Sequence, residues 1–209
     1  MVENKSGFIR LDVKKKTGAE RFYRNNQPLD MTLLNFWQWF TSDLASNATR
    51  GILAEYAEYI VAKALGITDG VRGEWDAYDL VTKSGVKIEV KSAAYLQSWY
   101  QKKLSVISFG IRPTRMWDAN TNELSKELKR QADIYVFSVV KPKEKDSLDP
   151  LNLDQWDFYI ILASVLDKKF PSQRSVRLAS LLKLNPCVAK YEQISSCIEK
   201  LSSCEKNTI

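Results

Sequence analysis

The sequence predicts an α/β protein in which helices flank a central mixed sheet, with helical additions at both ends. The chain has 209 residues, of which 44% are hydrophobic and 27% are charged, as in proteins that fold around an apolar core. Segments with the spacing of amphipathic helices alternate with short apolar runs typical of buried strands. Because the sequence contains neither repeats nor a low-complexity linker, we expect a single domain over residues 1–209. Its core covers about 47–163, between an N-terminal extension at 1–46 and a C-terminal helical region at 164–209.

Periodicity predicts the first elements. Residues 9–13 alternate between apolar and charged side chains, which predicts a short strand. Residues 31–44 are rich in aromatic side chains and predict a helix that packs on the rest of the protein. A stronger helix is predicted over 48–65, because its apolar residues follow helical spacing. Asn47 is its expected N-cap, and Gly66 lies just past its end.

Further strands and helices alternate along the rest of the chain. Residues 78–83 and 86–91 flank Ser84-Gly85, a turn signal between β-rich runs, and predict a hairpin. Apolar runs predict strands at 104–111, 134–140 and 156–163. Helices are expected at 123–131, 176–184 and 189–201.

The chain contains no histidine, which excludes many kinds of active site. Ser-His-Asp hydrolases, Cys-His proteases and histidine-ligated zinc enzymes all require one. The three cysteines (Cys187, Cys197 and Cys204) lack CxxC spacing, and their odd number argues against a disulfide framework. We therefore expect free thiols in a reducing compartment. An enzyme with this composition must use carboxylates and lysines, and any metal must be held by oxygen.

Composition also indicates where the protein works and what it binds. No apolar run approaches the roughly 18 residues that span a bilayer, and the first residues contain no apolar signal segment. We therefore expect a soluble, cytoplasmic protein with no membrane partner. The formal net charge is +6, from 31 Lys and Arg against 25 Asp and Glu, which suits a polyanionic partner such as nucleic acid.

The register of the predicted hairpin decides which side chains share a face. A two-residue loop at 84–85 would place Asp79 on the apolar face. A three-residue loop at 83–85 instead puts Gly85 where a type I turn followed by a bulge needs a left-handed residue. Apolar patterning favours the same loop, which pairs Thr82 with Val86, Leu80 with Ile88 and Asp79 with Glu89. One face then holds Tyr78, Leu80, Thr82, Val86, Ile88 and Val90, and the other holds Asp79, Val81, Lys87, Glu89 and Lys91.

This register brings two carboxylates and a lysine together. Asp79 and Glu89 lie side by side, and Lys91 lies two residues further along the same face, about 7 Å away. Adjacent carboxylates repel each other unless a cation lies between them or one of them takes up a proton. A pair of carboxylates that leaves positions for water suits Mg²⁺. The alternative is a solvated strand face, on which Lys87 and Lys91 neutralise the two carboxylates.

The same residues resemble a known catalytic motif. Asp79 followed by Glu89-Val90-Lys91 resembles the D…(D/E)xK signature of the PD-(D/E)xK nuclease superfamily, the restriction-endonuclease-like fold. Residues 50–55 resemble the leading helix of that superfamily, which often contributes a glutamate. The order of a helix, a strand with Asp and a strand with ExK is similar to the αβββαβ core of the superfamily over about residues 47–140. The residue before Asp79 is not the usual proline.

The resemblance implies a nuclease that hydrolyses phosphodiester bonds with Mg²⁺ or Mn²⁺. Asp79 and Glu89 would hold the metal, with the backbone carbonyl of Val90 as a further ligand. A metal held there lowers the pKa of a bound water and stabilises charge on the phosphate. Lys91 would orient or help to deprotonate that water and stabilise the developing charge.

A glutamate of the leading helix completes the site that the resemblance implies. Glu55 would be a further metal ligand, although it lies away from the apolar stripe of its helix. Glu58 is the alternative on the same helix. Asp76 competes with Asp79 for the position of the strand carboxylate, but Asp79 fits the hairpin register better.

Substrate contacts are predicted after the ExK strand, where basic and aromatic side chains interleave. The candidates are Gln97, Trp99, Lys102, Lys103, Arg112 and Arg115, with Lys129 and Arg130 as further phosphate contacts. Packing is the alternative explanation for Trp99 and Trp117. The expected substrate is DNA rather than RNA, and a homodimer would suit double-strand cleavage.

Two other functions fit the same sequence. One is a DNA- or RNA-binding module that keeps the nuclease fold without turnover, against which the intact Asp79, Glu89 and Lys91 argue. The other is a protein-interaction or structural α/β domain in which the motif arises by chance. Metal-dependent cleavage distinguishes the nuclease from the first, and nucleic-acid binding with a steep salt dependence distinguishes both from the second.

Overall fold

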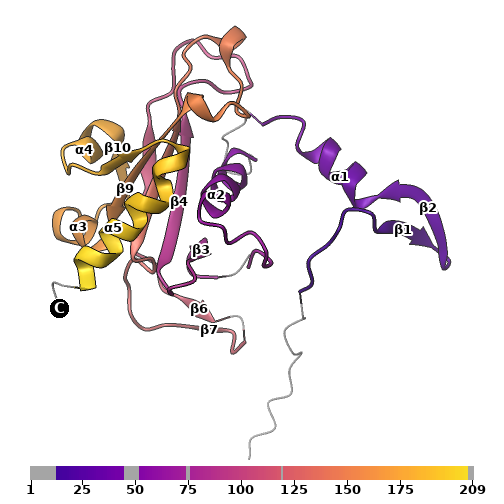
Figure 1. Ribbon diagram of the computed structural model, residues 1–209, viewed down its shortest axis with the longest axis horizontal. Coiled ribbons are helices and arrows are strands. Elements are labelled where there is room, and N and C mark those ends of the chain that lie inside the picture. The colour runs from indigo at the N-terminus through magenta and orange to yellow at the C-terminus, as the bar shows by residue number, and fades with distance from the viewer. Residues whose placement is uncertain (1–12, 45–51, 74–75, 119, 207–209) are drawn as a thin grey trace, which may run out of the picture.

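A five-stranded mixed sheet forms the centre of the computed structural model, which describes residues 13–44, 52–73, 76–118 and 120–206. The strand order is β11-β9-β8-β4-β3 (Figure 1). β4 and β8 are parallel, and the other neighbouring strands are antiparallel. The strands span Leu80–Val81 (β3), Lys87–Ala94 (β4), Ile134–Val140 (β8), Trp156–Leu162 (β9) and Cys187–Ala189 (β11).

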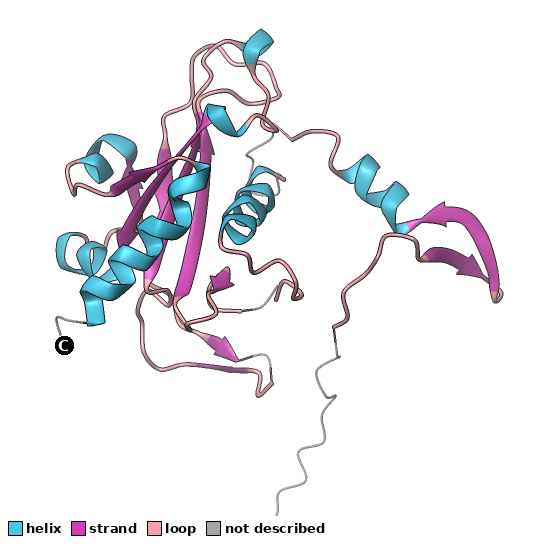
Figure 2. Cartoon of the chain, in the orientation of Figure 1, coloured by secondary structure: helices cyan, strands magenta, loops and turns pink. Residues whose placement is uncertain are grey.

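Different elements cover the two faces of this sheet (Figure 2). The first face packs against α2 (Leu53–Ala64) and α5 (Ile194–Lys206). The second face packs against a two-stranded sheet and two short helices, which are β5 (Ser108–Gly110), β10 (Ser175–Arg177), α3 (Ala163–Lys169) and α4 (Leu178–Leu182). The predicted α/β class, with a central mixed sheet flanked by helices, is confirmed.

An apolar core lies on each side of the sheet, because successive residues of a strand face opposite ways. In β8, Ile134 and Val136 belong to the core on the first face, here the first core. Tyr135 and Phe137 belong to the second core, on the other face. All residues of β8 are buried, and the strand coincides with the apolar run that predicted it.

α2 provides much of the first core. Leu53, Ala57 and Val61 are each 0% exposed and follow the predicted apolar stripe. The helix ends before Gly66, whose φ of 63° is the left-handed conformation expected of a glycine after a helix. The predicted start of this helix and its expected N-cap, Asn47, lie outside the described residues.

The connection from β4 to β8 contains strands but, apart from residue 119, which is not described, no helix. A hairpin of β6 (Trp117–Asp118) and β7 (Glu123–Leu124) lies there, beside a bridge between Thr114 and Lys129. The helix predicted over 123–131 is wrong, because this polar segment has no apolar stripe to bury. The αβββαβ order places a helix in this connection, so the structure does not reproduce that order. The strand predicted over 104–111 is shortened to β5.

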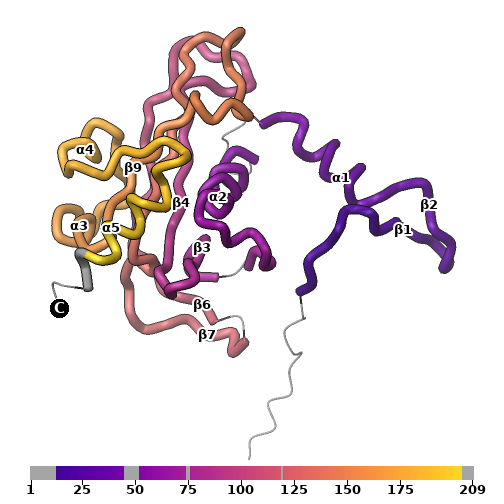
Figure 3. Tube along the Cα trace, viewed as in Figure 1, coloured from indigo at the N-terminus to yellow at the C-terminus, as the bar shows by residue number. Residues whose placement is uncertain are grey.

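The N-terminal arm, residues 13–44, extends away from the sheet (Figure 3). It consists of β1 (Arg21–Arg24), β2 (Gln27–Thr32) and α1 (Leu33–Phe40). The helix predicted at 31–44 is therefore present, but its packing on the rest of the protein is not, since no residue of α1 is buried and Trp39 is 75% exposed. The β1–β2 hairpin was not predicted. Its signal was Asn25-Asn26, whose φ values of 50° and 59° suit a two-residue hairpin loop.

The predicted strand at 9–13 falls almost entirely outside the described residues. The last third of the chain is less helical than predicted. The helix expected at 176–184 is divided between β10 and α4, and the one at 189–201 begins only after β11 and a 3₁₀ turn at Tyr191–Gln193. Two other 3₁₀ turns lie at Lys145–Ser147 and Leu153–Gln155. Within the described ranges, no helix is both long and apolar enough to cross a membrane.

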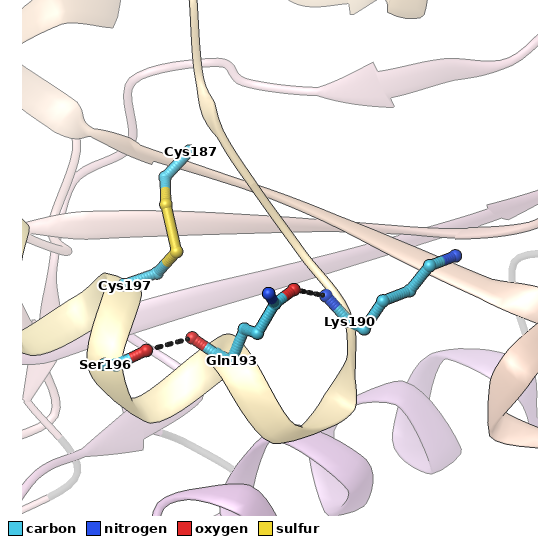
Figure 4. Close-up of a disulfide and its surroundings, with 5 residues drawn as sticks. All are labelled: Cys187, Lys190, Gln193, Ser196 and Cys197. Carbon is cyan, nitrogen blue, oxygen red and sulfur yellow. Dashed lines mark hydrogen bonds between the residues drawn. A yellow bond between two sulfur atoms is a disulfide. The ribbon is translucent and has the colours of Figure 1, made fainter.

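A disulfide joins Cys187 of β11 to Cys197 of α5, across a sequence separation of 10 residues (Figure 4). The prediction of free thiols is therefore wrong for these two residues. An odd number of cysteines does not prevent two of them from pairing, and here the return of α5 along β11 brings the two Cα atoms to 6.3 Å. The side chain of Cys204 lies outside the described part of the chain.

Candidate active site

The β3–β4 hairpin has the predicted three-residue loop. The amide of Thr82 donates to the carbonyl of Val86 at 2.9 Å, and the amide of Gly85 donates to the carbonyl of Thr82 at 2.9 Å. Gly85 has a φ of 85°, the left-handed conformation on which the loop prediction depended. Leu80 pairs with Ile88, as predicted.

Asp79, the residue just before β3, extends the pairing with β4 through both its backbone and its side chain. Its backbone amide donates to the carbonyl of Ile88 at 3.1 Å, which keeps Asp79 in register with β4. Its carboxylate oxygen Oδ2 accepts a hydrogen bond from the amide of Val90 at 2.7 Å. The carboxylate of Asp79 is therefore held at the edge of β4, beside the ExK residues.

Glu89 and Lys91 project from β4 on the second face of the sheet. The ammonium of Lys91 forms an ion pair with Oε1 of Glu89, and the two side chains are 33% and 19% exposed, respectively. Val90, between them, points into the first core. The predicted alternation along this strand is therefore confirmed, and the two charged side chains are half-buried rather than fully solvated.

Burial and neighbouring charges shift the pKa values of this cluster. Burial of the Asp79 carboxyl, with the negative charges of Glu89 and Glu58 added, raises its pKa to about 7 against the opposing effect of Lys91. Burial alone would lower the pKa of Lys91, but the carboxylates of Glu89 and Asp79 outweigh it and raise that pKa. Lys91 therefore stays protonated, whereas Asp79 titrates near neutral pH in the absence of a further cation.

The charge of a helix glutamate reaches this cluster from Glu58. Glu55 is exposed, whereas Glu58 is 7% exposed and its charge raises the pKa of Asp79. The carboxylate of Glu58 accepts hydrogen bonds from Arg72 at 2.6 and 3.3 Å. Glu55 lines the same pocket as Asp79, so its predicted role as a metal ligand stays a prediction. The burial of Glu58 was not evident from the sequence, because it lies on a side of the helix that the apolar stripe does not mark.

A pocket of about 370 Å³ opens beside Asp79, between α2 and the segment that leads into β3. Glu55, Glu58, Arg72 and Asp76 line it as well. The carboxylate of Asp76 is packed against Gly73, where an added Cβ would lie 2.0 Å from Oδ2. Asp79 rather than Asp76 is therefore the carboxylate held beside Glu89, as the register predicts.

The oxygen atoms of this site are of the type that a divalent cation takes as ligands. In the described part of the chain, no group of three Asp, Glu, His or Cys side chains is arranged to hold a metal ion. Asp79 and Glu89 supply two carboxylates, and Val90 directs its carbonyl to the same side as its amide, which is toward Asp79. Mg²⁺ typically uses one or two carboxylates and retains several waters. A cation would also relieve the repulsion that raises the pKa of Asp79.

Comparison with known families adds a finding that is independent of this geometry. The sequence matches the family described as bacteriophage T4 endonuclease IV over residues 1–179, which is most of the chain. The chain belongs to the bacteriophage T4 endonuclease IV family. Among curated proteins, no sequence matches it. Membership of the endonuclease IV family supports a nuclease, and the match includes Asp79, Glu89 and Lys91.

The predicted substrate contacts of this endonuclease IV family member do not all lie near the site. Gln97 is 5% exposed and its amide donates to the carbonyl of Ala94 at 3.2 Å, so a contact between Gln97 and substrate is not supported. Trp99 is half-exposed, and Lys102 and Lys103 are exposed. All four residues follow the C-terminal end of β4, whereas Glu89 lies near its start.

Arg112 and Arg115 follow β5, on the second face of the sheet, and line a pocket that contains no residue of β4. Met116, just after them, lines a neighbouring pocket together with Lys87, at the start of β4. Both arginines are exposed. Arg130, in contrast, is 5% exposed, and its guanidinium binds the carbonyls of Ile111 and Phe170, so it holds the fold together rather than contacting a phosphate.

Two tyrosines near the site were missed or misplaced. Tyr135 lies opposite Glu89 in the β4–β8 register, and burial, followed by the charge of Glu89, raises its pKa. The sequence around Glu89 does not indicate that Tyr135 lies beside it, because a long connection separates β4 from β8. Tyr78 was expected on the apolar face with Ile88, but its ring lies 5.4 Å from the ammonium of Lys87 and packs against the second core. The alternation fails there because β3 begins only at Leu80.

Proposed function

We propose that this endonuclease is a metal-dependent DNA nuclease whose catalytic residues are Asp79, Glu89 and Lys91. The observation that carries the proposal is the arrangement at the start of β4. There a buried carboxylate with a raised pKa is held beside an ion-paired glutamate and lysine. Paired carboxylates next to a protonated lysine are suited to binding a cation and a phosphate at once.

Asp79 and Glu89 would hold Mg²⁺ or Mn²⁺, together with the carbonyl of Val90. The bound cation would lower the pKa of a water and offset charge on the phosphate. The water oxygen would bond to phosphorus as the bond to one sugar oxygen breaks; the attacking water would give up one proton to the solvent, and the leaving oxygen would take one up from the solvent. Lys91 acts as a fixed positive charge rather than as a base, because its neighbours keep it protonated.

Glu58, the alternative to Glu55 on the same helix, would contribute its charge to this site. It lies close enough to raise the pKa of Asp79, and its ion pair with Arg72 fixes its position. Its negative charge adds to the attraction of the pocket for a cation. DNA is the proposed substrate because the family is named for a phage endonuclease and the chain is basic.

The decisive experiment compares cleavage with binding in one set of variants. Lys91→Ala should lower cleavage by about 10²–10³-fold, the loss typical of removing one group that stabilises transition-state charge. Its affinity for DNA should stay nearly that of wild type, because one lysine among many phosphate contacts adds little. Asp79→Asn should weaken Mn²⁺ binding as well as cleavage. Lys83→Ala, an exposed charge in the loop of the same hairpin, is the control and should change neither.

Digestion of single-stranded, duplex and branched DNA and of RNA, with Mg²⁺ or Mn²⁺ or with a chelator, defines the substrate. Chelation should stop cleavage by the wild-type protein. Binding without cleavage of any of these substrates in either metal would replace the nuclease with a non-catalytic nucleic-acid-binding module. Cleavage by Lys91→Ala at the wild-type rate would show that the catalytic site lies elsewhere.

A further inference from the structure

Three arginines from segments well separated in sequence from Asp79 and Glu89 line one pocket. Arg112 and Arg115 follow β5, and Arg174 precedes β10. All three line the same pocket of about 640 Å³, whose walls contain no carboxylate in the described residues. The pocket walls also include the largely exposed apolar side chains of Leu124 and Leu128. Cationic groups and apolar side chains in one pocket suit the phosphate and the sugar of a nucleic-acid strand.

The protein holds these arginines in place through its backbone. The amide of Ile111 donates to the carbonyl of Arg174 at 3.0 Å, which ties the segment of Arg112 to the segment of Arg174. The buried guanidinium of Arg130 donates to the carbonyls of Ile111 at 2.9 Å and Phe170 at 2.7 Å, and it also pairs with Asp167. The two segments are therefore fixed to each other before any ligand binds.

None of the three arginines forms an ion pair with any residue that the structure describes. Like charges around one pocket repel one another, and this repulsion is relieved by a bound anion. A guanidinium matches the geometry of phosphate oxygens with two parallel hydrogen bonds. The unpaired cluster is therefore better explained as an anion-binding surface than as part of the scaffold.

A second pocket lies between the arginine pocket and the start of β4. Residues 124–129 separate the two pockets, and their side chains contribute to the walls of both. Lys87 and Lys129 line the second pocket. Lys87 lies two residues before Glu89 on the same face of β4, about 7 Å along the strand. Glu127, Asp133 and Asp167 line the second pocket too, and Lys129 pairs with Glu127, so Lys87 is the basic side chain that lies between Glu89 and the arginines without a carboxylate partner in the described residues.

We propose that Arg112, Arg115 and Arg174 bind internucleotide phosphates of the DNA strand that extends from the catalytic site. This inference rests on the proposed function, because it takes DNA as the substrate. It adds Arg174 to the two arginines predicted from the sequence and assigns all three to one site. The arginines hold the strand away from the scissile phosphate and contribute to binding rather than to the chemical step.

The test measures DNA binding in a chelator, where no metal-dependent cleavage occurs, over a range of salt concentrations. The triple variant Arg112→Gln, Arg115→Gln, Arg174→Gln should reduce the dependence of log affinity on log salt by roughly 2 to 3, because each phosphate contact contributes about 0.7–0.9. The control removes three exposed charges elsewhere: Arg177→Gln, Lys183→Gln and Lys200→Gln. Its slope should stay close to that of wild type. Equal slopes for the two triple variants would overturn the proposal.

Two further measurements, of DNA cleavage and of pyrophosphate binding, distinguish a failure of the arginine site from a failure of the proposed nuclease function. In Mg²⁺, the arginine triple variant should need a higher DNA concentration for half-maximal cleavage, while Lys91→Ala should lower the rate at every DNA concentration. Wild-type protein that binds DNA with the arginine-dependent slope but never cleaves it would refute the nuclease and leave the arginine site standing. Inorganic pyrophosphate is the probe for a site that takes free phosphate compounds. If the triple variant loses pyrophosphate binding but keeps wild-type DNA affinity, the assignment to DNA is wrong.

Discussion

The two faces of the central sheet are both built on apolar cores, but only the second carries charged side chains on the sheet strands. In β4, Ile88 and Val90 enter the first core, while Glu89 and Lys91 project from the opposite face. The first face packs against α2 and α5 with no ionisable strand residue among its core members. The same strand therefore supplies stability on one side and the candidate chemistry on the other.

One carboxylate of the proposed site, that of Asp79, lowers the stability of the folded protein when it is charged. The raised pKa of Asp79, about 7, means that the folded protein disfavours the charged form of this carboxyl. A protein selected only for stability would not retain a buried carboxylate beside another carboxylate. The strand residues in the first core carry no charge. Substitutions of these residues should therefore change stability equally at all pH values, whereas substitutions of the charged residues on the second face should change it in a pH-dependent way.

The largest effect on stability is expected on the first face. Ile134 is 0% exposed in the first core, and Ile134→Ala should lower the free energy of unfolding by about 2–5 kcal/mol, through lost burial and the cavity left behind. Urea denaturation measures this loss. Cleavage per folded molecule should be unchanged, because the side chain points away from Glu89. A parallel loss of specific activity would mean that the two faces are not independent.

The pH dependence of stability should come from the second face. The folded pKa of Asp79 is raised from 3.8 to about 7, so its contribution to stability is complete below pH 4 and is lost as the pH rises through 7. Without metal, wild-type protein should lose at most about 1.4 kcal/mol per pH unit relative to Asp79→Asn within that window. Urea denaturation at pH 5, 6, 7 and 8 in a chelator gives this difference. Saturating Mg²⁺ should reduce it, because a cation favours the charged carboxylate.

A pH difference between wild type and Asp79→Asn that is absent, or of opposite sign, would remove the electrostatic argument for the site. Ile134→Ala serves as the matched comparison, since an apolar substitution on the first face should shift stability equally at each of these pH values.

The smallest effect is expected from the one buried polar atom that lacks a hydrogen-bond partner among the described side chains. This is the hydroxyl of Ser138, on β8 and 0% exposed. Ser138→Ala should raise the free energy of unfolding by about 1 kcal/mol, because an unsatisfied buried hydroxyl costs about that much or more. A thermal melt detects the change. Destabilisation instead would indicate that the hydroxyl has a partner in solution, and the first face would then be less purely apolar than the structure indicates.

The hairpin could be predicted from the sequence because its determinants are local. The turn needs a residue in the left-handed conformation, which Gly85 supplies, and the alternation of apolar and polar side chains in the two strands permits only one register. That register places Asp79, Glu89 and Lys91 close together. The run that became β8 was recognisable because a strand buried on both faces is apolar throughout. The chemical roles of the three site residues remain predictions.

The errors arise where distant segments decide the outcome. Glu58 is buried because Arg72 folds back over α2, which helical spacing does not reveal. The pairing of Cys187 with Cys197 depends on the path of the chain between them. The aromatic side chains of α1 have the composition of a buried helix, yet the arm holds them away from the sheet. Composition predicts that a segment forms a helix more reliably than it predicts what that helix contacts.

β11 lies in the part of the chain that follows the family match. The match ends at residue 179, and β11 pairs with β9 along the outer side of the sheet, from Cys187 to Ala189. A chain cut at the end of the match would leave β9, an apolar strand, with an open row of amide and carbonyl groups. Such edges recruit strands from other molecules and lead to aggregation. β11 therefore closes the outer edge of β9, and a chain that ended at residue 179 should associate with itself more readily than the full chain.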